Sequence, residues 1–324
     1  MAPLVWFVTG ATSGIGAALV AEILLRGDRV IATGRKVEER LGPQIPQKSD
    51  HVVFFEFDVT AEKSEIVQKV NEAWAIFGHI DVVVNNAGVS LLKSAEEAED
   101  ADVMKMFQVN LFGPMRVTQA FLPHFRNQGS GTLAFTSSSS ARYTVPFMSH
   151  YCASKAALST YVEALQTEVR PLGIRCVSFE CGGFLTMLGQ PRATTDADAD
   201  ADADADANKP SFGSTQPGVE AYLPLFAEFT GIFNVNPDDM VPNDMGKLTT
   251  RMVDCVKGEG LAKGRPWAVR IIMGSDAFSG AQQRLQEDQI LLSRWEDMSK
   301  MYREGSRYNE LVGPKMLKFN SILY

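Results

Sequence analysis

Residues 4–35 allow this chain few folds. A short apolar run, LVWFV, leads into a turn that contains Gly10, Gly14 and Gly16. A segment with helical apolar spacing follows to about Arg26, and the apolar run RVIAT comes next. Short apolar, β-branched runs predict strands, and the 3.6-residue spacing between them predicts a helix. We therefore expect one unit of strand, glycine turn, helix and parallel strand.

The glycine turn has the form of a phosphate-binding loop. Glycines let the backbone approach a pyrophosphate, and the free N–H groups at the helix start favour its negative charge. Thr12 and Ser13 can add hydroxyl donors. Glycine-rich turns also occur for tight packing alone, so the turn by itself leaves both readings open. Because both flanking elements are present, we predict a dinucleotide site.

The end of the second predicted strand indicates which dinucleotide. Gly34 stands where an acid would accept hydrogen bonds from the ribose of NAD(H), and Arg35 and Lys36 follow it. An arginine fork suits a 2′-phosphate, and a lysine adds a point charge. The pattern favours NADP(H) over NAD(H). The alternative is that both cations are solvated loop residues.

A tyrosine and a lysine four residues apart form the candidate catalytic pair. Tyr151 and Lys155 begin the run YCASKAALSTYVEALQTEV, whose composition and spacing predict a helix that shows both on one face. A nearby ammonium is expected to lower the phenol pKa, which would let Tyr151 exchange protons. Ser138 ends the apolar run TLAFTSS, a predicted strand, so its hydroxyl lies at the edge where α/β sheets bind ligands. Alone, such a pair more often marks an ordinary helix surface.

Two further predicted strands end in polar residues. Residues 51–60 end in Asp58 and Val59, where the carboxylate can accept from an adenine amino group or cap the next helix. Residues 80–90 run into Asn85-Asn86-Ala87-Gly88, whose amides can brace neighbouring strands and whose small residues admit a flat ring. This alternation of strands and helices predicts an α/β fold with a doubly wound parallel sheet.

A long helix is predicted from Ala98 to Phe125, and three residues interrupt it. Asn110, Gly113 and Pro114 are poor residues for a helix interior, and Pro114 removes one ladder hydrogen bond. We expect a kink there.

Composition fits one domain over residues 1–324, with 45% hydrophobic residues. The formal charge of −8 gives no sign of a nucleic-acid or anionic-membrane partner. Six acids belong to one Asp-Ala repeat, and without them 31 basic residues face 33 acidic ones, a balance of −2.

No stretch is long and apolar enough to suggest a membrane span, and the chain is expected to be cytoplasmic. The four cysteines lack metal-site spacing, so we expect free thiols and no metal: Cys152, Cys176, Cys181 and Cys255.

Residues 189–218 form a low-complexity insert. Alternating Asp and Ala bury too little surface to offset the ordering entropy, so disorder is expected. The apolar segment 219–233 either folds over a hydrophobic substrate or packs on the core. Residues 281–304 predict a polar helix, and residues 305–324 have no clear assignment.

Taken together, the chain resembles the classical short-chain dehydrogenase/reductase family. The family's glycine motif is matched by residues 9–16 and its Asn-Asn-Ala-Gly motif by residues 85–88. Its catalytic residues are matched by Asn110, Ser138, Tyr151 and Lys155. The likeness runs over nearly the whole chain. WFVTGATSGIG and WAVRIIMGSDAF are similar to a subgroup with hydroxysteroid- and retinol-dehydrogenase-like members and fungal secondary-metabolism reductases.

The resemblance implies a Rossmann-type fold and hydride transfer between NADP(H) and a carbonyl or secondary alcohol. Tyr151 would supply the proton, Ser138 would hydrogen-bond the reacting oxygen, and Lys155 would lower the tyrosine pKa and hold the nicotinamide ribose. Asn110 would position a water that links Lys155 to solvent. The implied cofactor-binding residues are Gly10, Thr12, Ser13, Gly14, Ile15, Arg35, Asp58, Val59, Asn85, Ala87, Tyr151, Lys155 and Thr186.

The chain departs from the family after the sixth strand. Cys181 stands where the family has proline, so the loop loses a fixed φ and gains a backbone donor. Thr186, which follows this departure, matches the residue that touches the nicotinamide carboxamide in the family. We interpret Cys181 as a packing residue.

Two functional classes remain open. The first is an NADP(H)-dependent oxidoreductase acting on a small, hydrophobic molecule. The second is a cofactor-holding relative with a regulatory or non-redox role. The apolar side chains of the Tyr151 helix spread over more than one stripe, so something covers a second face: Ala157, Leu158, Tyr161, Leu165 and Val169. The family implies that the cover is the same helix of another subunit, in a homodimer or homotetramer. The alternative is cover within one chain by the final long helix or by the segment 219–233.

Overall fold

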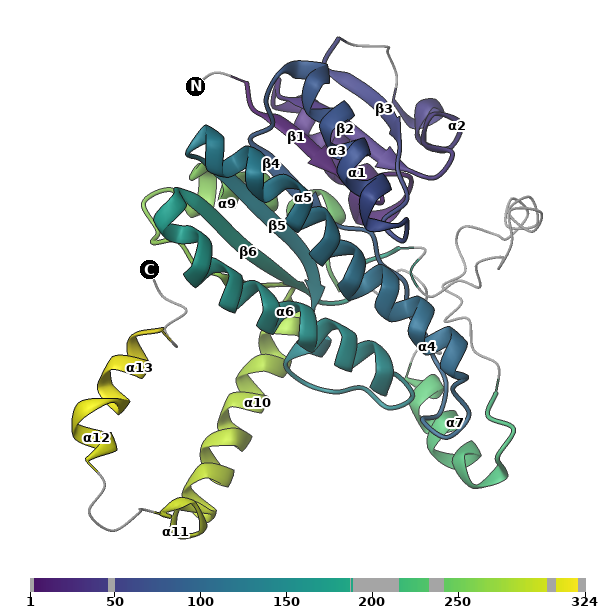
Figure 1. Ribbon diagram of the computed structural model, residues 1–324. Coiled ribbons are helices and arrows are strands. Elements are labelled where there is room, and N and C mark those ends of the chain that lie inside the picture. Colours follow the sequence, from purple (N-terminus) through teal and green to yellow (C-terminus); the bar gives the residue numbers. More distant parts are fainter. Residues whose placement is uncertain are drawn as a thin grey trace.

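A computed structural model describes residues 3–45, 50–186, 188, 216–232, 242–301 and 307–319. Its centre is a seven-stranded sheet in the order β3-β2-β1-β4-β5-β6-β7 (Figure 1). All six pairings are parallel. The strands are β1 Val5–Val8, β2 Arg29–Gly34, β3 Val52–Glu56, β4 Val82–Asn85, β5 Gly131–Ser138, β6 Ile174–Cys181 and β7 Arg270–Met273. The predicted doubly wound α/β fold is confirmed.

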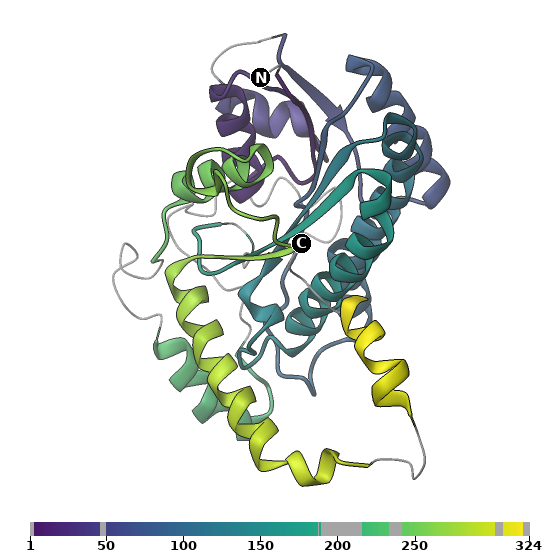
Figure 2. The same cartoon turned by 90° about the vertical axis from the view of Figure 1, so that its left-hand side faces the viewer.

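Helices cover both faces of the sheet (Figures 1 and 2). One layer contains α1 and α9, whose apolar residues join a cluster with β1, β2 and β4. The other contains α3, α5 and α6. The bounds are α1 Gly14–Leu25, α2 Val37–Leu41, α3 Lys63–Phe77, α5 Gly113–Gln128, α6 Ser149–Val169 and α9 Met245–Lys257.

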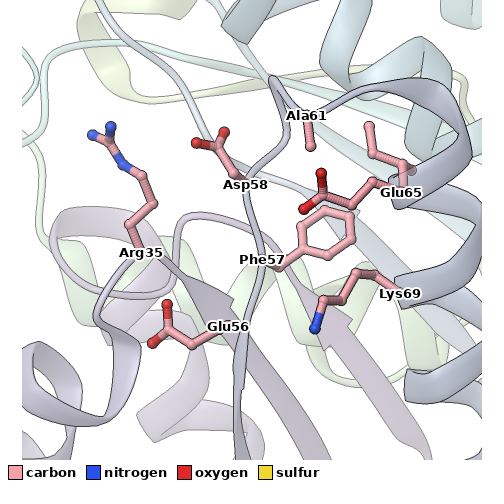
Figure 3. A pocket seen from close by; sticks show the side chains of 8 residues that line it. Arg35, Glu56, Phe57, Asp58, Ala61, Glu65 and Lys69 are labelled. Carbon is pink, nitrogen blue, oxygen red and sulfur yellow. The ribbon is translucent and has the colours of Figure 1, made fainter.

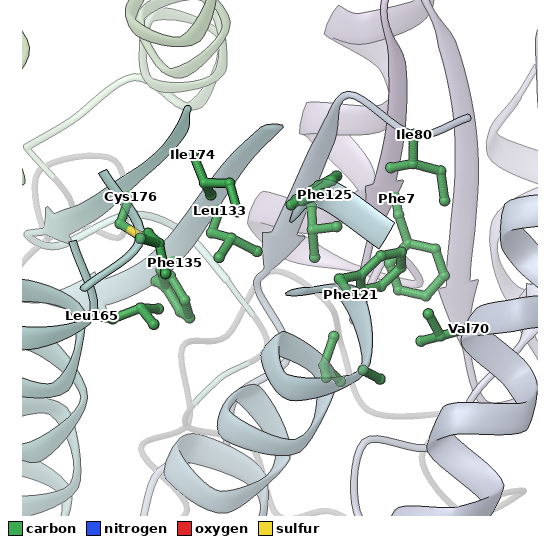
Figure 4. Packing of buried hydrophobic residues seen from close by; sticks show 14 of the residues in the cluster. Phe7, Val70, Ile80, Phe121, Phe125, Leu133, Phe135, Leu165, Ile174 and Cys176 are labelled. Carbon is green, nitrogen blue, oxygen red and sulfur yellow. The ribbon is translucent and has the colours of Figure 1, made fainter. Parts of the chain in front are cut away.

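The central strands are buried on both faces, which explains their continuous apolar sequence. In the α3–α5–α6 layer, Phe7 meets Phe57 and Phe121 edge-on, with ring centroids 5.4 and 5.0 Å apart. Figure 4 shows Phe7, Phe121 and Phe125 packed beside Leu133 and other side chains of this cluster. Burying each such side chain contributes about 1.5–3 kcal/mol, so this core fixes the sheet that carries the site.

The predicted interruption of the long helix is a π-helical turn. The helix α4 covers Asp100–Phe107, the π turn covers Gln108–Phe112, and α5 continues from Gly113. An ideal Cβ on Gly113 would lie 2.8 Å from the carbonyl oxygen of Val59, so only glycine allows this close approach. The π turn supplies the expected kink and sets Asn110 on the buried side of the helix.

The C-terminal part extends away from the sheet. The helix α10 covers Ser275–Arg294 and α11 covers Glu296–Ser299, and both views show α10 running outward from β7 (Figures 1 and 2). The predicted terminal helix is thus confirmed, but it begins before residue 281. Its exposed apolar side chains include Phe278, Leu285, Ile290, Leu291, Leu292 and Trp295. Beyond it, α12 covers Tyr308–Leu311 and α13 covers Gly313–Phe319.

The apolar segment after the insert folds as α7, Leu223–Gly231. Phe229 and Phe226 pack on Phe147, and Leu92 completes this small cluster. The Asp-Ala repeat lies outside the described residues, so its expected disorder stays a prediction. All four cysteines are free, as expected. Within the described ranges, no helix has the length and apolar character needed to span a bilayer.

Candidate active site

The predicted site residues follow the carboxyl ends of six neighbouring strands or lie on helices beside them. They are the turn residues Gly10, Thr12, Ser13, Gly14 and Ile15 after β1, Arg35 after β2, Asp58 and Val59 after β3, Asn85 and Ala87 at β4, Ser138 at β5, Thr186 after β6, Asn110 in the π turn, and Tyr151 and Lys155 on α6. This is the edge where open α/β sheets bind ligands.

The glycine turn packs closely against two other segments. Gly10 has a φ of +63°, and an ideal Cβ there would lie 2.7 Å from the Cα of Ala87. A Cβ on Gly16 would lie 2.2 Å from the carbonyl oxygen of Gly10. Gly14 has a φ of +55°, and an ideal Cβ there would lie 3.3 Å from the methyl of Thr186. Tight packing therefore requires Gly10 and Gly16, whatever binds at the turn.

The residues around this turn suit a dinucleotide. The turn opens α1 with Ser13 as the N-cap residue, and no side-chain cap hydrogen bond uses its hydroxyl. Asn85 is 2% exposed, and neither its amide nitrogen nor its amide oxygen has a hydrogen-bond partner within the described part of the chain. A buried amide rarely lacks partners, so it marks a place for a polar ligand.

Asn86 has the bracing role predicted for this motif. Its amide nitrogen donates to the carbonyl oxygens of Thr9 and Gly10 at 3.0 and 3.1 Å. Its amide oxygen accepts from the Thr136 hydroxyl at 3.1 Å. Asn86 therefore links the strands β1 and β5 across β4, at the base of the site.

The far end of the site lies between the ends of β2 and β3. Figure 3 shows Arg35, Glu56 and Asp58 around one pocket. The two Glu56 oxygens accept from the backbone N–H groups of Lys36 and Val37, at 2.9 and 2.7 Å. Lys36 has a φ of 50°, which is uncommon for a residue with a side chain. Glu56 thus holds the turn that carries Arg35, a role that no sequence pattern indicates.

Asp58 does not cap the following helix. Its Oδ1 accepts from the backbone N–H and the hydroxyl of Thr60, at 2.8 and 2.7 Å. The helix α3 begins at Lys63 with Glu62 as its N-cap residue, so the capping alternative is wrong. Asp58 lines the pocket of Figure 3, and the adenine contacts of Asp58 and Val59 stay predictions.

Ser138 and Tyr151 meet at the centre of the site. Ser138 ends β5, and its hydroxyl accepts from the backbone N–H of Ser140 at 3.1 Å. Tyr151 lies in the first turn of α6 and is 5% exposed. Burial raises the pKa of Tyr151 to about 12, while a hydrogen bond with Ser138 acts to lower it. Within the protein, Tyr151 is therefore a neutral phenol at pH 7.

The expected lowering of the tyrosine pKa by Lys155 is wrong for the protein alone. The Lys155 ammonium lies 5.9 Å from the centre of the Tyr151 ring and donates to the carbonyl oxygen of Thr136 at 3.0 Å. Burial lowers the pKa of Lys155 to about 8. Spacing in the helix correctly predicted the shared face, but desolvation by burial is the largest influence on both pKa values.

Asn110 is fixed on both sides. Its amide oxygen accepts from the Val89 N–H at 2.9 Å, and its amide nitrogen donates to the Val89 carbonyl at 2.9 Å and the Ser154 hydroxyl at 3.1 Å. An ideal Cβ on Gly88 would lie 3.5 Å from both the Asn110 amide oxygen and the Lys155 ammonium. Asn110 and Lys155 thus flank the loop after β4.

Cys181 is a packing residue in the structure. It is buried at the end of β6 and belongs to the apolar cluster of the α1–α9 layer. Burial raises the pKa of its thiol to about 12, so the thiol is neutral at pH 7. A neutral, buried thiol is a poor nucleophile.

Comparisons with known proteins agree with this arrangement. A family model described as short chain dehydrogenase matches residues 4–197. The oxidoreductase BOA17 of Botryotinia fuckeliana is 35% identical over 182 residues, which are 56% of this chain and 66% of that protein. The NADPH-dependent 1-acyldihydroxyacetone phosphate reductase of Saccharomyces cerevisiae is 33% identical over 187 residues, 57% of this chain and 62% of that protein. Each match spans less than two thirds of the relative.

A short-chain dehydrogenase structure from Streptomyces avermitilis matches with a TM-score of 0.73 at 28% identity, and it covers 93% of this chain and 99% of its own. The family match spans more than half of the chain, and the sheet carries the family's motif residues at its ligand-binding edge. This chain therefore belongs to the short-chain dehydrogenase family.

Proposed function

We propose that this protein is an NADP(H)-dependent oxidoreductase that interconverts a carbonyl and a secondary alcohol on a small, hydrophobic molecule. The observation that carries the proposal is the grouping of Ser138, Tyr151, Lys155 and Asn110 beside the glycine turn, at the carboxyl edge of the sheet. A bound nicotinamide would supply the hydride. The chain's own residues orient the reactants and move the proton.

The Tyr151 phenol is the proton donor in the reductive direction. Its pKa of about 12 keeps the proton on the oxygen at neutral pH. The Ser138 hydroxyl, which shares a hydrogen bond with Tyr151, also binds the substrate oxygen and stabilises the charge that develops there. Lys155 presents an ammonium with three donors, of which one is directed to Thr136, and binds the nicotinamide ribose with another.

The apolar cluster of Leu92, Phe147, Phe226 and Phe229 supports an apolar substrate. Phe147 lies four residues before Tyr151 in the sequence, in the turn that leads into α6. The names of two relatives also describe reductions: the yeast 1-acyldihydroxyacetone phosphate reductase and the 3-ketodihydrosphingosine reductase of Bacteroides thetaiotaomicron. A place in secondary metabolism remains part of the proposal.

A spectrophotometric screen for NADPH consumption tests the reaction class. The panel should hold apolar ketones, quinones and aldehydes, with small hydrophilic ketones as the matched set. We expect turnover with apolar carbonyls. Tight NADPH binding without turnover of any carbonyl would favour the cofactor-holding class.

The first prediction concerns the cofactor. Arg35 follows Gly34, and an ideal Cβ on Gly34 would lie 2.8 Å from the Thr12 methyl, so an acid cannot stand there without moving Thr12. NADPH should therefore bind more tightly than NADH, and Arg35→Ala should weaken NADPH binding about tenfold while changing NADH binding little. Titration of both cofactors measures this, with Arg29→Ala as a control cation on β2. Equal wild-type affinities would contradict the NADP(H) assignment.

The oligomeric state is also a proposal. Leu158, Leu165 and Val169 of α6 are buried in the chain's own core, so they give no support for a second covered face. Tyr161 is half-buried and packs edge-on against Phe135. We retain the homodimer or homotetramer, and light scattering at micromolar concentration would decide between it and a monomer.

A further inference from the structure

The loop after β6 lacks the family's proline, yet it is firmly held at its start. The Gly183 N–H donates to Oδ2 of Asp276 at 2.7 Å. The Asn243 amide donates to the Gly183 carbonyl at 2.8 Å and to Oδ1 of Asp276 at 2.6 Å. Asp276 and Asn243 therefore bind both backbone groups of Gly183. Asp276 lies in the first turn of α10, and Asn243 precedes α9.

Two glycines make room for this contact. An ideal Cβ on Gly182 would lie 2.2 Å from Oδ1 of Asp276. Gly274 has a φ of +125°, and a Cβ there would lie 2.8 Å from the same oxygen. Asn243 is itself oriented, because its amide oxygen accepts from the Ser275 N–H at 2.9 Å. The Asp276 carboxylate thus occupies a site that fits it closely.

The same loop is held again farther along. The Ser90 hydroxyl donates to the Leu188 carbonyl at 2.8 Å, and the Leu188 N–H donates to the Thr186 hydroxyl at 3.3 Å. Between these two attachments, Thr186 lies over the glycine turn, 3.3 Å from the ideal Cβ of Gly14. The position of Thr186 therefore depends on Asp276 and Asn243 on one side and on Ser90 on the other.

We propose that Asp276, together with Asn243, is a positioning residue for the nicotinamide half of the cofactor site, acting through Gly183 on Thr186. In this chain the pair performs the task that a proline with its fixed φ would otherwise perform. The inference rests on the proposed nicotinamide cofactor. It adds a residue that touches neither cofactor nor substrate.

The carboxylate contributes more to placement than to folding. Asp276 is half-buried and Gly183 is exposed, so water can replace the lost partner of the Gly183 N–H in a variant. The loop would keep its covalent path but lose its defined position. The effect should therefore appear in binding of the nicotinamide end and leave the adenosine end unchanged.

Two ligands separate these ends: NADPH, and 2′-phospho-ADP-ribose, which lacks the nicotinamide. In Asp276→Ala we expect the Kd for NADPH to rise about tenfold, because the variant loses one charge-assisted hydrogen bond. The Kd for 2′-phospho-ADP-ribose should stay within twofold of wild type. Asp276→Asn, which keeps an oxygen for Gly183, should bind NADPH more tightly than Asp276→Ala. The matched control is Asp288→Ala on the same helix, where the carboxylate pairs with Arg284 at the surface.

A double-mutant cycle tests whether Asp276 acts through Thr186. In a Thr186→Ala background, Asp276→Ala should weaken NADPH binding less than threefold. The inference is overturned if Asp276→Ala weakens NADPH binding as much in that background as in the wild-type protein. It is also overturned if Asp276→Ala weakens binding of both ligands equally, or if it leaves NADPH binding unchanged. These outcomes differ from failure of the proposed cofactor, in which the wild-type protein binds neither ligand, and from failure of the proposed reaction, in which it binds NADPH and turns over no carbonyl.

Discussion

Tyr151→Phe is expected to lower carbonyl reduction about a thousandfold, within the range that positioned general acids contribute. The substitution removes only the hydroxyl and keeps the ring, which is buried at the start of α6. The Lys155 ammonium donates to Thr136, so loss of the phenol should leave it in place. The Kd for NADPH should therefore stay close to the wild-type value.

Tyr161→Phe is the matched control. Tyr161 lies on the same helix, and burial raises its pKa to about 12 as well. It packs edge-on against Phe135 in the core. We expect full turnover in Tyr161→Phe. Beside a loss of turnover in Tyr151→Phe, this result would show that the loss depends on the position of Tyr151 and is not shared by every buried tyrosine. Retained turnover in Tyr151→Phe would instead exclude the phenol as the proton donor.

The fold could be predicted from local patterns in the sequence. The runs at β1 and β5 are continuous and apolar because both faces of a central parallel strand are covered. Glycines and polar residues mark where each strand ends. Because parallel strands end at one edge, the motifs after β1, β2, β3, β4 and β5 could be placed together before any coordinates were known.

The electrostatics of the site could not be predicted from spacing. Tyr151 and Lys155 share a face, as their separation indicates, but their protonation depends on burial by segments far away in the chain. Desolvation favours the neutral form of each group, so it raises the pKa of Tyr151 to about 12 and lowers the pKa of Lys155 to about 8. A helical repeat carries no information about how deeply that helix is covered.

The positioning residues also escape sequence patterns. Glu56 holds the Arg35 turn from 20 residues away, and Asp276 holds Gly183 from 93 residues away. Both are single acids in ordinary surroundings, and neither belongs to a periodic motif. The π turn at Asn110 is intermediate: three poor helix residues indicated an interruption, but only the contact between Gly113 and Val59 explains its form.

Lys155→Met is expected to impair both cofactor binding and turnover. Methionine keeps much of the side-chain length but removes the ammonium, which donates to Thr136 and lies beside Asn110. The Kd for NADPH should rise about tenfold, and kcat/KM should fall about a thousandfold. The control is Lys257→Met, where another largely buried lysine pairs with Asp28 at the opposite end of the sheet. That variant should lose thermal stability and keep the wild-type Kd for NADPH.

The pH profile of the wild-type enzyme supplies a second measurement. Lys155 is a base whose pKa is lowered to about 8, so the ammonium is present below pH 8 and is lost as the pH rises through that value. The Tyr151 phenol keeps its proton to about pH 12 and adds no change below that. Because kcat/KM reports the free enzyme, it should be constant for reduction up to about pH 8 and then decline. The decline should disappear in Lys155→Met, whose residual activity has no ammonium to lose. If the decline persists unchanged in this variant, the group that titrates is not Lys155.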